Sequence, residues 1–180
     1  MYKMSDKPLL SAEQIRTRVA ALAHEISESY DYDILLSALT GAYMFTADLS
    51  RELAKAQGKA ASTKEIAFIK ASSYGNSTKS SGNLQVRGLE KIDLAGKRIL
   101  LVDDIADTGT TLLGLSRMLC EKGANVRTCV LLNKQERREV EFHADYIGFE
   151  IANEFVVGYG LDYANHYRML PEIWTLQETN

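Results

Sequence analysis

Residues 97–111, KRILLVDDIADTGTT, decide the fold, because a buried strand runs here directly into a polar loop and a helix. The strand is expected from Lys97 to Val102, a length that suits an apolar strand covered on both faces. The helix is expected from Thr110 to Lys122, and a second apolar strand from Asn125 to Leu132. Strand, helix and strand at these lengths form a βαβ unit, which predicts a parallel sheet with a right-handed crossover.

The rest of the chain extends this unit into one α/β domain. Ser11 and Gln14 have the spacing of a capping box, so a helix is expected to open there. No repeat, low-complexity tract or linker divides the chain, which predicts a single domain over residues 1–180. The other expected elements are helices at 11–30, 42–56 and near 161–167, and strands at 33–39, 65–72, 83–87, 146–149, 155–157 and 172–176.

Composition excludes several classes of protein before any motif is considered. The 180 residues are 46% hydrophobic and 25% charged, with a net charge of −3, which argues against binding nucleic acid through bulk charge. No apolar run approaches the ~18 residues of a membrane span, and polar residues 1–8 lack a signal core. Cys120 and Cys129 have no metal-binding spacing and indicate a reduced, cytoplasmic protein. Neither a nucleic acid nor a membrane is therefore expected as a partner.

Acidic and small polar residues gather where the central strand ends. In open α/β sheets, ligands bind outside the carboxyl ends of the strands. The loop from Asp107 to Thr111 offers backbone N–H groups, hydroxyls and a helix N-terminus, which suit a phosphate. Asp103 and Asp104 would repel a bare phosphate, so they make sense as holders of hydroxyl groups, of Mg²⁺, or of both. A ligand with a phosphate at one end and a diol in its middle is a ribose 5-phosphate.

Three other interpretations of this stretch fit less well. Asp103, Asp104 and Asp107 could merely cap the helix, but one acid would suffice for that. A response-regulator receiver carries its acidic pair near the start of the domain, and too little chain remains after Asp104 for such a module. A nucleotide-binding P-loop would need G-x-x-x-x-G-K-[ST], which is absent, and Gly158-Tyr159-Gly160 lacks the third glycine of a dinucleotide fingerprint.

Five segments, taken in chain order, form a recognisable set: 39–49, 72–78, 99–111, 131–134 and 154–168. They resemble the pyrophosphate loop, lid, phosphoribosyl pyrophosphate motif, purine-contacting segment and hood of type I phosphoribosyltransferases. Within that group they are most similar to hypoxanthine (hypoxanthine-guanine) phosphoribosyltransferases. The resemblance implies a type I phosphoribosyltransferase fold, with a central, mostly parallel sheet flanked by helices. The core is expected at about 30–150, a small hood from the N-terminal segment and about 151–180, and a lid loop at about 73–82.

The resemblance also implies an activity. A 6-oxopurine, hypoxanthine or guanine, would attack C1 of phosphoribosyl pyrophosphate through N9, with Mg²⁺ as cofactor, giving IMP or GMP and pyrophosphate. Exposed helices beside a small sheet suit a homodimer or homotetramer. Two alternatives stay open: a regulator of the same fold that senses phosphoribosyl pyrophosphate, and a transferase for another base such as adenine, xanthine or uracil.

Roles for individual residues follow from the resemblance. The ribose and phosphate set is Asp103, Asp104, Asp107, Thr108, Gly109, Thr110 and Thr111, with Asp107 also taking the N7 proton. The pyrophosphate set is Leu39, Thr40, Gly41 and Arg168, with a cis peptide at Leu39–Thr40. The purine set is Lys134, Phe155, Val156 and Asp162, the lid set is Ser73 and Tyr74, and the metal set is Asp103, Asp104 and Asp162.

Some of these residues have plainer interpretations, and two depart from the family pattern. Lys134 could be a solvated lysine in a charged turn, and Phe155 could belong to the core. Asp162 could be a turn aspartate and Arg168 a surface cation. The family often has Lys or Arg where Thr40 stands, and Glu is common where Asp103 stands.

Overall fold

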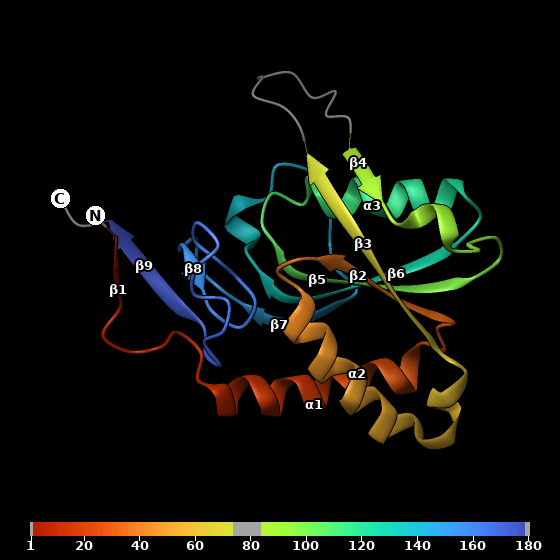
Figure 1. The fold of residues 1–180 in the computed structure, drawn as a ribbon, viewed down its shortest axis with the longest axis horizontal. Helices are drawn as coiled ribbons and strands as arrows, with labels where there is room; N and C mark the ends of the chain where they lie inside the picture. Colours follow the sequence, from red (N-terminus) through yellow and green to blue (C-terminus); the bar gives the residue numbers. More distant parts are fainter. Residues whose placement is uncertain (1, 74–83, 179–180) are drawn as a thin grey trace.

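A computed structural model describes residues 2–73 and 84–178 of the protein, and its centre is a six-stranded sheet (Figure 1). The strand order is β4-β3-β2-β5-β6-β7, with β4 antiparallel to β3 and the other pairs parallel. The elements are β1 (Tyr2–Met4), α1 (Ala12–Ser29), β2 (Ile34–Leu39), α2 (Tyr43–Gln57), β3 (Glu65–Ser73), β4 (Leu84–Arg87), β5 (Arg98–Ala106), α3 (Thr110–Glu121), β6 (Asn125–Asn133), β7 (Tyr146–Glu150), β8 (Val156–Val157) and β9 (Trp174–Glu178). Short 3-10 helices lie at Gly58–Thr63, Leu89–Lys91 and Gln135–Arg137.

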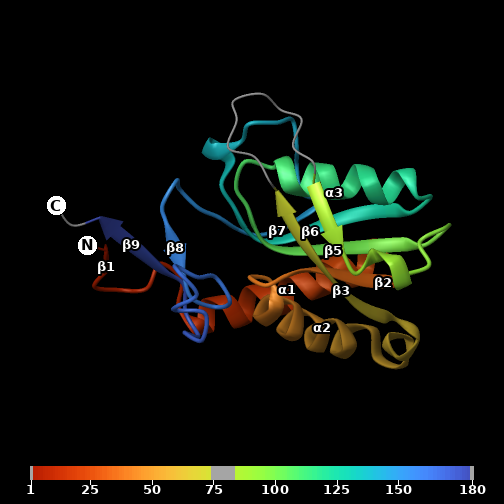
Figure 2. The ribbon, with the colours of Figure 1, turned by 45° about the horizontal axis from the view of Figure 1, so that its top comes forward.

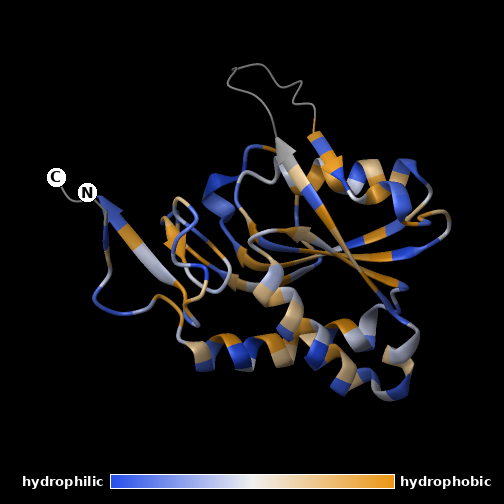
Figure 3. Cartoon of the chain, viewed as in Figure 1, coloured by the Kyte–Doolittle hydropathy of each residue, from blue (hydrophilic) through white to orange (hydrophobic). Residues whose placement is uncertain are grey.

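Helices cover both faces of the sheet, with α1 and α2 on one side and α3 on the other (Figures 1 and 2). Alternate residues of β5 point to opposite faces, so Leu100 and Val102 pack with α1 and α2, whereas Ile99 and Leu101 pack with α3. This two-sided burial explains the continuous apolar run that marked the strand in the sequence. Apolar colouring recurs along the central strands in Figure 3. The expected mostly parallel sheet flanked by helices is confirmed.

The strand β5 runs four residues farther than expected, through Ala106. Its acidic end stays in the sheet because Asp103 pairs in register with Val130 and Ala106 with Asn133 of the neighbouring β6. The paired acids therefore belong to a strand rather than to the loop after it. Backbone pairing holds them more rigidly than a loop would.

A second sheet, in the order β1-β9-β8, joins the beginning and the end of the described chain. The strand β1 pairs antiparallel with β9, with Tyr2 opposite Glu178, so the termini lie close together (Figure 1). The sequence did not predict β1. The helix expected near residues 161–167 is wrong: Ala164, Asn165 and Tyr167 have positive φ angles, which a right-handed helix does not allow.

The predicted capping box opens α1. The backbone N–H of Ser11 donates to Gln14 Oε1 at 2.9 Å, and the N–H of Gln14 donates to Ser11 Oγ at 3.2 Å. Within the described residues, no helix combines the length and apolar character needed to span a bilayer.

Candidate functional site

The carboxyl ends of three neighbouring strands bring the expected site residues to one edge of the central sheet. Thr40 and Gly41 follow β2, Asp103 and Asp104 lie near the end of β5, and Lys134 follows β6 directly. The backbone N–H of Lys134 donates to the carbonyl of Ala106 at 2.9 Å, which ties the ends of β5 and β6 together. This is the edge where open α/β sheets bind their ligands.

Asp103 and Asp104 form a closely spaced, partly buried carboxylate pair. Asp103 Oδ1 accepts a hydrogen bond from the backbone N–H of Asp104, and Asp104 Oδ1 accepts one from Ile105, each at 3.0 Å. Burial, and then the negative charge of Asp104, hold the pKa of Asp103 well above its usual range. Burial also raises the pKa of Asp104, although the positive charge of Arg168 acts in the opposite direction. Such a pair favours a nearby cation or hydroxyl donors.

The turn after β2 packs directly against this pair. A Cβ atom on Gly41 would lie 1.7 Å from Asp104 Oδ2, so only a glycine fits beside the carboxylate. A Cβ atom on Gly160 would lie 2.1 Å from the carbonyl oxygen of Gly41, which places the last third of the chain against the same turn. The Leu39–Thr40 peptide is cis, as the resemblance implied.

The loop between β5 and α3 has the features of an anion site. Gly109 has a φ of 84° and precedes the first residue of α3, a backbone shape that suits glycine. The hydroxyl of Thr108 accepts from the backbone N–H of Thr110 at 3.3 Å, and Thr110 is exposed. The start of a twelve-residue helix therefore faces outward beside the carboxylate pair.

Two cations flank the carboxylate of Asp107. Arg137 Nε donates to Asp107 Oδ1 at 3.1 Å, and Lys134 Nζ lies 3.9 Å from Asp107 Oδ2. Lys134 is only 6% exposed, so the interpretation as a solvated lysine in a charged turn is wrong. Burial lowers the pKa of Lys134, and the charge of Asp107 opposes that shift. A buried ammonium at the site edge can donate hydrogen bonds but cannot accept them.

The segment around β8 brings an aromatic ring and an ion pair to the site. Phe155 is 47% exposed, so it is not a core residue. Its ring packs edge to face against the ring of Tyr163, with 5.8 Å between the two ring centroids. Val156 is buried in β8. Arg168 Nη2 lies 2.7 Å from Asp162 Oδ1, and its Nη1 donates to the carbonyl of Gly160 at 2.7 Å. Asp162 and Arg168, expected in different roles, are thus direct partners.

The expected lid set begins at the end of β3, and two of the expected metal ligands lie near the end of β5. The backbone of Ser73 ends β3, while Tyr74 and the rest of the lid expected at 73–82 lie outside the described residues. Across residues 2–73 and 84–178, His, Cys, Asp and Glu side chains nowhere gather in threes that could hold a metal ion. Any Mg²⁺ at the Asp103–Asp104 pair would need ligand or water oxygens to complete its coordination, as Mg²⁺ commonly does.

A group of polar side chains behind the loop was not expected from the sequence. Asn133 is 2% exposed, and Arg137 and Arg138 reach back to Asp107. The signal available was a polar residue ending an apolar strand, followed by two adjacent arginines. Nothing in the spacing of these residues shows which atoms they contact.

Comparison with known proteins was consistent across sequence and structure. A model of the phosphoribosyl transferase domain matches residues 7–164. The hypoxanthine-guanine phosphoribosyltransferase of Aquifex aeolicus is 40% identical over 176 residues, covering 96% of this chain and 95% of that protein. The hypoxanthine phosphoribosyltransferase of Escherichia coli K12 is 37% identical over 170 residues, covering 92% of each.

Solved structures agree. A variant hypoxanthine phosphoribosyltransferase from Trypanosoma cruzi, in a ternary substrates complex, has a TM-score of 0.87 and 38% identity, covering 96% of each chain. A further T. cruzi structure, with a TM-score of 0.87 and 37% identity, covers 98% of this chain and 94% of that one. It concerns the role of the C-terminal region in the oligomeric state and enzymatic activity of that enzyme.

Proposed function

Because the chain belongs to the phosphoribosyl transferase domain family, we propose a role for each part of its site in the reaction of that family. The chain is a purine-salvage transferase, which moves the 5-phosphoribosyl group of phosphoribosyl pyrophosphate to N9 of hypoxanthine or guanine. The carrying observation is that a carboxylate pair, the loop before the N-terminus of α3 and a buried ammonium meet at one sheet edge. Sugar, phosphate and base each find complementary chemistry there.

The sugar phosphate is proposed to bind between β5 and α3. Asp103 and Asp104 accept hydrogen bonds from the ribose diol, and the loop from Asp107 to Thr111 holds the 5′-phosphate with its N–H groups and hydroxyls. Support comes from the position of the carboxylate pair directly before the start of α3. The phosphate then lies at the positive end of a helix, separated from the acids by the ribose.

The leaving pyrophosphate is proposed to lie between Gly41 and Arg168. The backbone of Leu39–Gly41 and the guanidinium of Arg168 can bind its oxygens, and Mg²⁺ supplies charge neutralisation when it is bound. Asp103 and Asp104 fit such an ion, because they are adjacent, partly buried carboxylates at the end of β5 and carboxylate oxygens are the ligands that Mg²⁺ prefers. Asp162 is a second metal ligand in this proposal, which requires its ion pair with Arg168 to loosen when substrate binds.

The purine is proposed to lie between Lys134 and Phe155. Lys134 donates to the 6-oxo group, Phe155 stacks on the ring, and the backbone of Val156 reads the edge with N1 and N2. The 47% exposure of Phe155 and the burial of Lys134 support this placement. Asp107 accepts the N7 proton as N9 bonds to C1, a role supported by the 3.9 Å between its Oδ2 and Lys134 Nζ. The sheet of β1, β8 and β9 acts as the hood over this base.

An activity assay with a set of different bases tests the proposed function. Phosphoribosyl pyrophosphate and Mg²⁺ should support turnover with hypoxanthine or guanine, detected as IMP or GMP, and EDTA should abolish it until Mg²⁺ is restored. Turnover with adenine or uracil but not with hypoxanthine or guanine would show that the substrate base is a different one. Additional turnover with xanthine would widen the proposed range of bases. Binding of phosphoribosyl pyrophosphate without turnover of any base would favour the regulator, and full activity in EDTA would contradict the metal role.

Gly41→Ala is expected to weaken binding of phosphoribosyl pyrophosphate by about tenfold or more, because the added methyl displaces Asp104 or the turn. Calorimetric titration measures the affinity. Gly114→Ala in α3 is the matched control, since its added Cβ would meet only Leu84 Cδ2 at 3.2 Å. Equal affinities for Gly41→Ala and the wild type would show that the turn does not bind the pyrophosphate.

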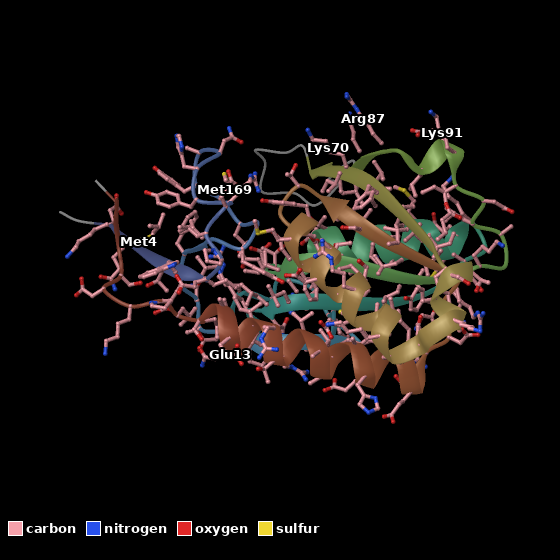
Figure 4. All side chains as sticks on the ribbon, turned by 60° about the horizontal axis from the view of Figure 1, so that its bottom comes forward. Met4, Glu13, Lys70, Arg87, Lys91 and Met169 are labelled. Carbon is pink, nitrogen blue, oxygen red and sulfur yellow. The ribbon has the colours of Figure 1, made fainter. Side chains whose placement is uncertain are left out.

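A homo-oligomer, a dimer or tetramer, is proposed to form through the open face of β3. Ile66 and Phe68 are 49% and 48% exposed there, because Ala67 and Ile69 are the residues of β3 that face α3. Lys70 lies two residues after Phe68 and pairs in register with Arg87, and both side chains project outward from the sheet (Figure 4).

Phe68→Glu is expected to convert this oligomer to monomers, because a carboxylate cannot be buried unpaired in an apolar contact. Sedimentation velocity measures the mass. Met169→Glu is the control, since Met169 is 86% exposed and lies on the hood, apart from β3 (Figure 4). A monomeric wild-type protein would contradict the proposal.

We also propose that the protein works in the cytoplasm. Its free cysteines, Cys120 and Cys129, fit that reducing compartment.

A further inference from the structure

The guanidinium of Arg138 joins the phosphate loop to the strand behind it. Arg138 Nη1 donates to the backbone carbonyl of Asp107 at 3.1 Å. Its Nη2 donates to Oδ1 of Asn133, the last residue of β6. One planar group thus connects the loop after β5 with the end of β6, at the edge where the substrates bind.

Asn133 is itself held in place from the next strand. Its amide Nδ2 donates to both carboxylate oxygens of Glu150, each at 2.9 Å. Glu150 ends β7, and Asn133 is 2% exposed. The hydrogen bonds from Asn133 to Glu150 orient the amide so that its oxygen faces Arg138. The ends of three parallel strands are therefore linked through Arg138, without any contribution from a ligand.

The same arginine also forms the floor of the loop. A Cβ atom on Gly109 would lie 2.8 Å from Arg138 Cδ and 3.2 Å from Phe142 Cβ, so the loop backbone rests on both side chains. The guanidinium lies 5.4 Å from the ring centre of Phe142. The next residue, Glu139, donates its backbone N–H to the carbonyl of Thr108 at 3.0 Å. The segment after β6 thus holds three consecutive residues of the loop.

Stability alone is a poor reason for an arginine here. Its Nε is buried and finds no hydrogen-bond acceptor among the described residues. An unpaired buried donor costs free energy that an apolar side chain of similar shape would avoid. The contacts that the guanidinium does make join the carbonyl of Asp107 in the loop to Asn133 at the end of β6, which is an arrangement suited to positioning the loop.

We propose that Arg138 is a positioning residue, which fixes the backbone from Asp107 to Gly109 and so aims both the phosphate-binding N–H groups and the Asp107 carboxylate. The proposal rests on the proposed function of that loop. Arg138 acts through the backbone carbonyl of Asp107, on the side of the loop that carries Asn133 and Phe142. Preorganised loops of this kind lose activity steeply when their supports are removed.

Two variants and one control test this role. Arg138→Met keeps an apolar stem and removes all donors, whereas Arg138→Lys keeps the charge but has no planar fork to bridge two acceptors. Arg18→Met is the matched control, because Arg18 also clamps backbone, with Nε and Nη2 donating to Gly148 and Ile147 carbonyls at 2.8 and 2.7 Å. Arg18 joins α1 to the middle of β7, away from the loop.

Arg138→Met should raise KM for phosphoribosyl pyrophosphate by about tenfold or more and lower kcat, since a misplaced loop affects both binding and proton transfer. Arg138→Lys should recover only part of the loss. Arg18→Met should lower the melting temperature while leaving KM near the wild-type value. Unchanged kinetic constants in both Arg138 variants, or an equal change in KM for Arg18→Met, would overturn the inference.

A second measurement is independent of turnover. In the protein without substrates, amide hydrogen exchange over residues 104–112 should be faster in Arg138→Met than in the wild type, and unchanged in Arg18→Met. Unchanged exchange in a folded Arg138 variant would overturn the positioning role, whatever the activity. A further outcome is that the wild type fails to bind phosphoribosyl pyrophosphate while Arg138→Met still shows faster exchange. That result would support the positioning of the loop by Arg138 and refute the proposed function of the loop. If Arg138→Met does not fold, Arg138→Lys provides both measurements.

Discussion

Lys134→Gln is expected to reduce the preference for hypoxanthine over adenine more than any other single change. A site built for one hydrogen-bond pattern can discriminate by about 10⁴–10⁵. The ammonium of Lys134 is buried and can donate to a 6-oxo group, but it has no lone pair for the 6-amino group of adenine. A glutamine amide can both donate and accept, so most of that discrimination should disappear. The ratio of kcat/KM for the two bases measures it.

The effect should be specific to the base. The KM for phosphoribosyl pyrophosphate should change far less than kcat/KM for hypoxanthine, because Lys134 lies at the end of β6 and not in the phosphate loop. Equal losses toward both substrates would mean that Lys134 supports the site generally. Lys134→Arg keeps the charge and separates the need for a cation from the need for a single donor.

The same residue predicts a pH dependence. Burial lowers the pKa of Lys134. As the pH rises, Lys134 therefore loses its positive charge at a lower pH than a free lysine, whose pKa is about 10.4. The kcat/KM for hypoxanthine should therefore fall on the alkaline side. Lys134→Arg remains charged, so its alkaline limb should lie at higher pH. Both proteins receive the same base, so titration of hypoxanthine itself cancels in the comparison, and superimposable limbs would contradict the assignment.

Asp107→Asn is expected to lower kcat by about 10²–10⁴-fold, because asparagine keeps the shape of the side chain but cannot accept the N7 proton. Binding of phosphoribosyl pyrophosphate should change little. Arg137 Nε would lose its ionised partner at 3.1 Å, yet the backbone carbonyl of Asp107 would still accept from Arg138. Single-turnover and steady-state rates are both needed, since fast chemistry can hide behind product release.

Asp104→Asn is the matched control for the proton-transfer role. It also replaces a carboxylate by an amide at the end of β5, but it should weaken binding of the sugar phosphate instead. The two variants therefore separate proton transfer from ribose binding. Single-turnover rates for Asp107→Asn that match the wild type would leave Asp107 as an ion-pair partner of Arg137 and Lys134 with no part in the proton transfer.

Much of the fold could be predicted from local pattern. The run from Ile99 to Val102 is apolar because β5 is covered by helices on both faces, and such a run identifies a central parallel strand. Ser11 and Gln14 opened α1 as expected, since a capping box depends only on residues three apart. Where the expectation failed, near residues 161–167, the backbone is bent by positive φ angles and by an isolated bridge between Tyr163 and His166.

The family was also recognisable from the sequence, because the acids near the end of β5 and the loop after them are contiguous residues. Their order along the chain dictates their order in space at the end of one strand. What tertiary structure alone decided is which distant residues meet them. Gly41 must be a glycine because Asp104, far along the chain, occupies the space of its side chain.

The pairing of Asp162 with Arg168, and the support that Arg138 and Asn133 give to the loop, were likewise decided in three dimensions. Arginine carries its donors at the end of a long flexible stem, so sequence position does not determine which acceptor it reaches. Strands and caps are local and can be predicted from spacing. The hydrogen-bond network behind the loop depends on how the ends of β5, β6 and β7 lie side by side, and only the folded sheet provides that arrangement.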